Sequence, residues 1–360
     1  MSSEIDKLQG EALQDYDKKS FEEDCPKYNY FPTILPQRKR IIAIGDLHGD
    51  YKLTLDCLKL AKVIDNNNNW IGEDTAIVQV GDQLDSCRPL EMTCDNPKAT
   101  ENDKPDDIKI LKFFTELDKK ARKTNGIVYS LLGNHELMNS FGNLNYVSYE
   151  NVIMFNKDKK EKDPKKIYKN GSNERKKQFA PGNELGKFMG CTRICTVIIG
   201  NFLFVHAGII PEFIKLMKIN NRYDLIKINY YVRKWLLGLI SPENVKEIIN
   251  SNKYSPFWDR ILGSIPYNVS IDYDKRCTEF LEPVLKLFNI DTMIIGHTPQ
   301  FSNGINFTCD KKLWRIDHGG SEAFNKFVLN ESTNELRKAQ VLEILTDDNG
   351  NSSFNIIRKK

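Results

Sequence analysis

The sequence predicts an α/β fold built around largely parallel strands. Apolar runs at 41–44, 75–80 and 127–132 are typical of buried strands. Apolar residues at helical spacing lie between them, over 51–63 and 108–122. Alternation of strand and helix places the strands in parallel, so their carboxyl ends line up along one edge of the sheet. Ligands of such sheets bind at that edge.

The first strand is followed by the stretch 45–50, Gly-Asp-Leu-His-Gly-Asp. Asp46 and His48 are two residues apart, so their side chains point to the same side of an extended backbone. A carboxylate beside an imidazole suits a borderline divalent metal such as zinc, manganese or iron. Taken alone, the stretch fits equally well an interpretation in which Asp46 caps the following helix and His48 is a polar turn residue.

The second and third strands end in a similar way. The stretch 81–85, Gly-Asp-Gln-Leu-Asp, follows one of them, and 133–136, Gly-Asn-His-Glu, follows the other. Because the strand ends share an edge, we expect their polar side chains to converge there. The converging set is Asp46, His48, Asp82, Asp85, Asn134 and His135.

The second half of the chain continues this pattern. Residues 211–250 are predicted to be mostly helical, and 277–288 to form a helix that tolerates Pro283 or breaks at it. Strands are predicted at 195–199, 201–205, 292–295 and 313–316, with closing edge strands at 340–345 and 354–357. The chain has five histidines, and each lies at or just past a predicted strand end. They are His48, His135, His206, His297 and His318.

This set of side chains suits a two-metal centre. Two aspartates, one asparagine and three histidines can hold two metals that share one carboxylate, and such a pair activates a water for in-line attack at phosphorus. Asn134 is a neutral oxygen ligand, which limits the negative charge facing an anionic substrate. His135 is free to protonate the leaving-group oxygen, and Asp85 can orient it. Arginines near such a site would hold phosphate oxygens.

The motifs together resemble those of the phosphoprotein-phosphatase (PPP) type of the calcineurin-like metallophosphoesterase superfamily. Besides the first three motifs, His-Ala-Gly at 206–208 and Gly-His-Thr-Pro at 296–299 match. The resemblance covers roughly residues 38–345. It is greater for the bacterial-like branch, the Shewanella-like phosphatases, because of Gly-His-Thr-Pro, of Trp-x-Arg at 258–260, and of the missing Ser-Ala-Pro-Asn-Tyr segment of the eukaryotic Ser/Thr enzymes.

The resemblance implies an α/β sandwich, in which two mixed sheets stack face to face between helices. It also implies two divalent metals (manganese, iron or zinc) above the strand ends. His135 is then the general acid, paired with Asp85, and Arg260 holds the phosphate. The first metal falls to Asp46, His48 and Asp82, and the second to Asp82, Asn134, His206 and His297.

Two residues depart from the family pattern: Ser86 and, as a minor change, Ala207, which stands where glycine is usual. Ser86 stands where the family has a phosphate-binding arginine. Either Arg88 reaches the same phosphate from a displaced loop, or the site functions with one arginine. His318 is no family ligand; we expect a strand-end residue that lines the pocket or pairs with Asp317.

The implied activity is metal-dependent hydrolysis of phosphomonoesters, with a phosphorylated protein as the expected substrate. One alternative is hydrolysis of dinucleoside polyphosphates or other small phosphoesters within the same superfamily. Another, of a different class, is a non-catalytic scaffold that keeps the fold, for which Ser86 is the only support.

Composition limits the partners and the location. A net charge of +3 over 360 residues gives no reason to expect nucleic acid. No apolar run approaches the ~20 residues of a membrane-spanning helix, and the polar N-terminus lacks the features of a signal peptide. We therefore expect an intracellular, cytoplasmic protein with free thiols. Cys87 and Cys94 could close a loop by a disulfide, but free thiols are the favoured interpretation.

The expected organisation is an N-terminal extension at 1–37 and a single catalytic domain at 38–358. The extension is charged and aperiodic, so we expect it to wrap the surface or to be partly disordered. Within the domain, a lysine-rich insertion at about 156–187 is expected to be a solvated, mobile loop with turns at 170–171 and 181–182. A docking site for an acidic partner is the alternative there. A helical segment is expected at about 211–290.

Overall fold

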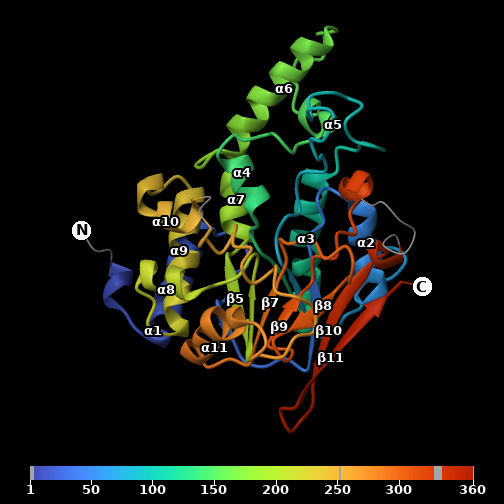
Figure 1. The fold of residues 1–360 in the computed structure, drawn as a ribbon. Helices are drawn as coiled ribbons and strands as arrows, with labels where there is room; N and C mark the ends of the chain where they lie inside the picture. The colour runs from blue at the N-terminus through green and yellow to red at the C-terminus, as the bar shows by residue number, and fades with distance from the viewer. Residues whose placement is uncertain (1–3, 251–252, 328–334, 360) are drawn as a thin grey trace.

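A computed structural model describes residues 4–250, 253–327 and 335–359. Within these residues two sheets stack face to face between helices, which confirms the predicted α/β sandwich (Figure 1). Parts of the predicted extension (1–3) and of the predicted catalytic domain (251–252 and 328–334) lie outside the described residues. The division of the chain at residue 37 stays a prediction.

The first sheet contains the three strands whose ends carry the first motifs. Its order is β11-β10-β2-β3-β4, and β2, β3 and β4 run parallel to one another. Their carboxyl ends therefore meet at one edge, as predicted. The strands are β2 (Arg40–Ile44), β3 (Ala76–Gln79), β4 (Ile127–Ser130), β10 (Gln340–Thr346) and β11 (Ser352–Arg358).

The second sheet carries the two later histidine motifs. Its order is β1-β5-β6-β7-β9-β8, with β6, β7 and β9 parallel and β5 antiparallel to β6. Two of its strands, β1 and β8, were not predicted. The strands are β1 (Ile34–Leu35), β5 (Thr196–Ile199), β6 (Phe202–Val205), β7 (Thr292–Ile295), β8 (Asn306–Thr308) and β9 (Leu313–Arg315).

The alternation of side chains along each strand produces three apolar layers. In β2, Ile41 and Ala43 face the second sheet, whereas Ile42 and Ile44 face helices α2 (Tyr51–Leu60) and α3 (Asp107–Ala121). Both faces of the strand are buried, which explains why it is apolar throughout. The remaining helices of the core are α4 (Asn134–Ser140), α5 (Tyr149–Ile153), α8 (Pro211–Met217), α9 (Leu225–Leu236), α10 (Lys246–Ile249) and α11 (Glu282–Phe288).

The N-terminal segment is more ordered than its composition suggests. Residues Glu11–Asp24 form helix α1, which packs beside α9 (Figure 1). The short strand β1 adds a parallel strand to β5. A buried ion pair between Asp17 and Arg233, with atoms 2.7 Å apart, ties the two helices together. Charged side chains such as Asp17 make this segment look aperiodic in the sequence. Some of them, however, face the rest of the fold and pair with it.

The prediction of a mobile loop at 156–187 is wrong. Residues Pro164–Phe179 form helix α6, which projects beside α5, and Glu184–Thr192 form α7 (Figure 1). The predicted turn at 170–171 lies inside α6. Gly171 is there for close packing, because a β-carbon at this position would lie 2.4 Å from the carbonyl oxygen of Val152. The turn at 181–182 is present.

No helix among the described residues combines the length and the apolar character needed to span a bilayer.

Candidate active site

The turn after β2 brings Asp46 and His48 to the sheet edge. The backbone N–H groups of Leu47 and His48 both donate to the carbonyl of Asp82, at 2.9 Å, which ties this turn to the one after β3. His48 Nδ1 lies 3.3 Å from the Leu84 carbonyl, so Nδ1 carries the proton and Nε2 is left as the free donor atom. Asp50, not Asp46, caps α2 by accepting from Leu53 N.

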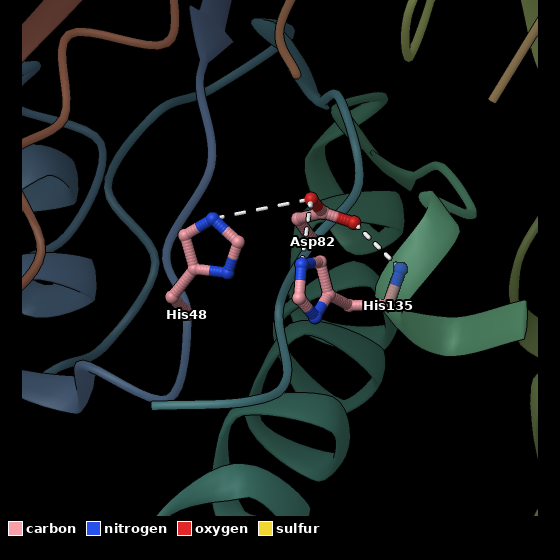
Figure 2. A group of neighbouring side chains, drawn as sticks. All are labelled: His48, Asp82 and His135. Carbon is pink, nitrogen blue, oxygen red and sulfur yellow. Dashed lines mark hydrogen bonds and ion pairs between the residues drawn. The ribbon is translucent and has the colours of Figure 1, made fainter. Parts of the chain in front are cut away.

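The Asp82 carboxylate lies at the centre of the site. Its Oδ2 is 3.9 Å from His48 Nε2, 3.9 Å from His135 Nε2 and 3.4 Å from His206 Nε2. Figure 2 shows the carboxylate next to the rings of both His48 and His135. Its Oδ1 accepts from the backbone N–H of His135, at 3.0 Å, which fixes its orientation. A carboxylate with this placement can be shared by two metals.

The second donor group forms around His206 and His297. The Nδ1 of His206 bonds the Val80 carbonyl at 2.8 Å, and its Nε2 faces Asn134 Oδ1 at 2.9 Å. With Asp82, the two histidines place their donor atoms within 4.8 Å of one another. Asp46 approaches from the other side, accepting from His297 N at 3.0 Å. All six predicted ligands are therefore buried at one edge.

The chemistry of this donor set fits divalent metals. Asp46 Oδ1 and His297 Nε2 are buried and have no hydrogen-bond partner among the residues that the structure describes, an arrangement that costs free energy unless a ligand satisfies them. Burial holds the pKa values of His48 and His297 well below the usual range, which keeps both rings neutral, as metal ligands must be. Burial alone would raise the pKa of Asp82, but His206 and His135 hold it well below its usual range.

The backbone of the site is strained at several of these positions. Residues other than glycine rarely adopt positive φ, and such conformations cluster at functional sites. Here they occur at His48 (φ 43°), Asp82 (53°), Asp85 (74°) and His297 (67°).

His135 and Asp85 form the predicted pair. His135 Nδ1 is 2.8 Å from Asp85 Oδ2, and the carboxylate is fully buried. The Nε2 atom of His135 is therefore the one that faces Asp82 and the cavity.

A cavity of about 870 Å³ opens above this edge. Arg88 and Arg260 both line it, whereas Ser86 does not. Ser86 lies against Gly49, and its hydroxyl accepts from Asn151 at 3.4 Å. Arg88 donates to the carbonyl oxygens of Asp85 and Cys87 and stacks on the Phe324 ring at 4.5 Å. The loop after Asp85 therefore brings Arg88, and not Ser86, to the cavity.

Comparisons with known proteins agree with this geometry. The sequence profile described as calcineurin-like phosphoesterase matches residues 39–301. The chain is a calcineurin-like phosphoesterase. An uncharacterised protein of Acanthamoeba polyphaga mimivirus is 43% identical over 263 residues, 69% of this chain and 98% of that protein. Shewanella-like protein phosphatase 2 of Arabidopsis thaliana is 28% identical, over 81% of this chain and 73% of that one.

Two further relatives extend the comparison. Shewanella-like protein phosphatase 1 of Plasmodium berghei is 29% identical over 85% of this chain and 73% of its own length. The solved cold-active protein-tyrosine phosphatase of a psychrophilic Shewanella has a TM-score of 0.62 at 21% identity, over 97% of this chain and 85% of that one. The likeness to the solved structure shows the fold. The resemblance drawn from the motifs is confirmed, and divalent metals belong to the chemistry of this family.

The sequence reasoning gave no role to Glu136. Its carboxylate accepts from the backbone N–H groups of Asp82, Gln83 and Gly133, at 2.7–2.9 Å. This clamp holds the Asp82 turn against the start of α4. The sequence contains a signal for this role, because a glutamate three residues after the N-cap of a helix, as in the capping box, can bond back to the backbone at the start of the helix.

His318 is neither a cavity residue nor a partner of Asp317. It is buried, and burial lowers its pKa to about 4. Asp317 instead accepts from Gly319 N. His318 is therefore a neutral core residue of the phosphoesterase.

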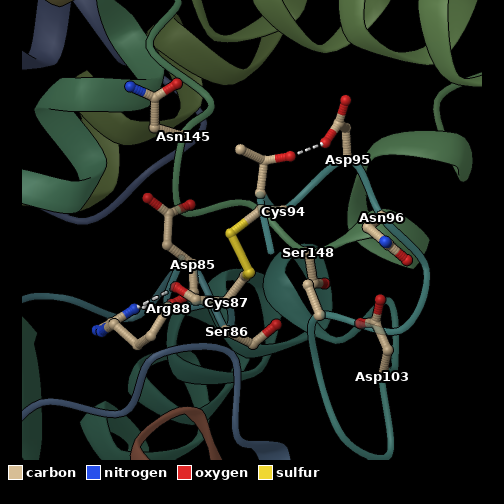
Figure 3. Close-up of a disulfide and its surroundings, with 12 residues drawn as sticks. Asp85, Ser86, Cys87, Arg88, Cys94, Asp95, Asn96, Asp103, Asn145 and Ser148 are labelled. Atoms are coloured by element: carbon tan, nitrogen blue, oxygen red, sulfur yellow. Dashed lines mark hydrogen bonds between the residues drawn. A yellow bond between two sulfur atoms is a disulfide. The ribbon is translucent and has the colours of Figure 1, made fainter. Parts of the chain in front are cut away.

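The prediction of free thiols is wrong for six of the eight cysteines. Disulfides join Cys87 to Cys94, Cys25 to Cys191 and Cys277 to Cys309; Cys57 and Cys195 are free and buried. In the first disulfide the loop after Asp85 folds back so that the two Cα atoms are 5.9 Å apart. Figure 3 shows this bond beside Arg88, with Arg88 and Ser86 pointing in different directions from the same turn.

The Cys87–Cys94 disulfide should therefore help to position Arg88. We expect Cys94→Ser to lower kcat/KM for a phosphomonoester about 10-fold, because the arginine loses its fixed place, and to lower the free energy of unfolding by about 2 kcal/mol. Steady-state kinetics and thermal melts measure the two effects. Cys309→Ser is the control, expected to lower stability alone. An unchanged kcat/KM in Cys94→Ser would count against this role.

Proposed function

We propose that this phosphoesterase is a protein phosphatase that removes phosphoryl groups from phosphorylated side chains. The observation that supports this most is the arrangement around one cavity. The potential metal ligands around Asp82 are buried beside this cavity, and His135, which Asp85 bonds, and Arg88 line it.

We further propose that Asp46, His48 and Asp82 hold one divalent metal, and Asp82, Asn134, His206 and His297 the other. Manganese, iron and zinc all suit this mixture of oxygen and nitrogen donors. When bound, such a pair lowers the pKa of a water and neutralises the charge of the phosphoryl group.

His135 is the general acid in this proposal. Asp85 holds its Nδ1, so the proton carried on Nε2 is directed at the leaving-group oxygen, which would otherwise depart as a costly alkoxide. Arg88 and Arg260 hold the non-bridging phosphate oxygens from two sides of the cavity. Arg260 is positioned by donating to the carbonyl of His297, at 3.1 Å.

The apolar part of the cavity lining supports a protein substrate. Aromatic and aliphatic side chains there can contact a peptide, and Phe141 is half exposed. The apolar lining residues are Met138, Phe141, Tyr146, Pro242, Ile249, Trp258 and Phe324.

The location stays a prediction, and the disulfides weigh against the cytoplasm. Disulfides persist in oxidising compartments and are rare in reducing ones. Two of the three disulfides described here, Cys25–Cys191 and Cys277–Cys309, join segments that are separated along the chain. The third, Cys87–Cys94, closes a loop at the site.

Replacing Arg88 tests the placement of the phosphate. We expect Arg88→Met to raise the inhibition constant of inorganic phosphate and to lower kcat/KM about 10- to 100-fold, because a charge-assisted bidentate contact is lost. Ser86→Ala is the matched control and should leave both values unchanged, since Ser86 faces away from the cavity. Equal effects of the two substitutions would contradict the role of Arg88.

A substrate panel tests the function itself. Manganese-loaded protein is assayed on phosphoserine, phosphothreonine and phosphotyrosine peptides and on a dinucleoside tetraphosphate. The proposal expects hydrolysis of at least one class of phosphopeptide. Hydrolysis of the dinucleotide alone would overturn it in favour of a small-phosphoester hydrolase, and inactivity with metals bound would favour a scaffold.

A further inference from the structure

Arg175 is a buried arginine that no step of the proposed reaction uses. It lies in the C-terminal half of α6, within the insertion, and has no exposed surface. Its guanidinium lies over the rings of Phe179 and Phe155, at 4.8 and 5.4 Å. An apolar side chain would pack there at less cost, because burying a charge requires partners that compensate for lost hydration. Its partners therefore indicate what the residue does.

The first partner connects Arg175 to the catalytic pair. Its Nε donates to Asn139 Oδ1, at 2.9 Å. Asn139 in turn donates from Nδ2 to Asp85 Oδ1, at 2.8 Å. Because the Nδ2 and Oδ1 atoms of one amide have opposite roles, the arginine fixes which way the amide faces. Asn139 is then obliged to present a donor to the carboxylate.

The second partner acts on the backbone of the same residue. An Arg175 Nη atom donates to Asp107 Oδ2, at 2.7 Å, and Asp107 Oδ1 accepts from the backbone N–H of Asp85, at 3.2 Å. The same guanidinium lies 3.8 Å from Asp85 Oδ1 itself. Asp85 is thus held at its backbone and at one carboxylate oxygen, while its other oxygen holds His135 Nδ1.

The charges are consistent with this arrangement. Asp85 and Asp107 are two fully buried carboxylates, and Arg175 is the guanidinium that lies between them. Without it, the carboxylates would repel each other and Asp85 could turn away from His135. The guanidinium also donates to the Asn151 carbonyl, at 3.0 Å, which anchors it to α5.

We propose that Arg175, acting through Asn139 and Asp107, is a positioning residue for His135: it holds Asp85 so that the imidazole stays aimed at the leaving group. The inference rests on the proposed function, in which His135 is the general acid. It assigns the insertion helix α6 a part in the reaction, although α6 supplies no cavity-lining residue.

The test compares two leaving groups. A phosphoserine peptide needs a proton on its departing oxygen, whereas 4-nitrophenyl phosphate leaves as a stabilised phenolate without one. We expect Arg175→Lys to lower kcat on the peptide about 10- to 100-fold and kcat on the aryl ester less than about 3-fold. The KM values and the bound manganese, measured by elemental analysis, should not change.

A second variant keeps the inference testable if Arg175→Lys fails to fold. Arg175→Met alone leaves two buried carboxylates uncompensated, so it is combined with Asp107→Asn, which removes one charge and keeps the acceptor for Asp85 N. The double variant Arg175→Met/Asp107→Asn should show the same dependence of kcat on the leaving group as Arg175→Lys. In an Asp85→Asn background the effect of Arg175→Lys should vanish, because both act on one unit.

Arg233→Met is the matched control. Arg233 is also buried and forms an ion pair with Asp17, but it lies in α9 and has no contact with His135 or Asp85 among those described. It should lower the melting temperature and show no dependence on the leaving group. Equal losses on both esters in the Arg175 variants, with melting shifts like that of Arg233→Met, would overturn the inference. If His135→Asn itself shows no such dependence, the general-acid proposal fails instead.

Discussion

Replacing His135 with asparagine is expected to lower kcat on a phosphoserine peptide about 10²- to 10⁴-fold, the usual contribution of general acid catalysis. The loss on 4-nitrophenyl phosphate should be smaller, because its leaving group departs without a proton. Metal content should not change, because His135 bonds Asp85 through Nδ1 and is not among the ligands proposed for either metal. Kinetics on both esters with elemental analysis of the purified protein measure these effects.

His318→Asn is the control for the loss of a buried imidazole. His318 is as buried as His135 but does not line the cavity. If His318→Asn lowers kcat, it should do so equally on the two esters and in proportion to the fall in melting temperature. Full activity of His135→Asn on the peptide would refute the assignment of the acid.

The second large effect is expected at Asp82. Its carboxylate lies 3.9 Å from His48 Nε2 and 3.4 Å from His206 Nε2, so Asp82→Asn removes the one ligand that the two proposed metals would share. We expect the variant to lose tightly bound metal and activity together. Manganese should raise the melting temperature of the unmodified protein, because a ligand that binds only the folded state stabilises it, and it should not do so for the variant.

Asp118→Asn is the matched control for Asp82. Asp118 is also buried and accepts from a backbone N–H, that of Val128, but it lies in α3, belongs to none of the motifs and does not line the cavity. Its variant should keep the manganese-dependent rise. A normal rise in Asp82→Asn would contradict the shared-ligand role.

The strand ends made most of the site predictable. Parallel strands end at one edge, so Asp46, Asp82 and Asn134 could be placed together without knowing any distance. The apolar strands themselves were predictable because both faces of β2, β3 and β4 are covered. The sandwich arrangement came from the family resemblance, since periodicity does not show how two sheets stack.

The remainder depends on contacts that no local pattern records. Arg175 lies in a lysine-rich helix and is indistinguishable in composition from its exposed neighbours. Its buried guanidinium is compensated by Asp107, which lies 68 residues away along the chain. The place of Arg88 likewise depends on a loop that the Cys87–Cys94 disulfide folds back, and spacing alone does not determine such a bond.

Anomalous diffraction from crystals grown with manganese tests the central claim most directly. The proposal predicts two manganese peaks about 3.5–4 Å apart, one on each side of the Asp82 carboxylate. One should contact Asp46 and His48, and the other Asn134, His206 and His297. A single peak, or peaks that do not contact Asp82, would contradict the two-metal centre proposed here.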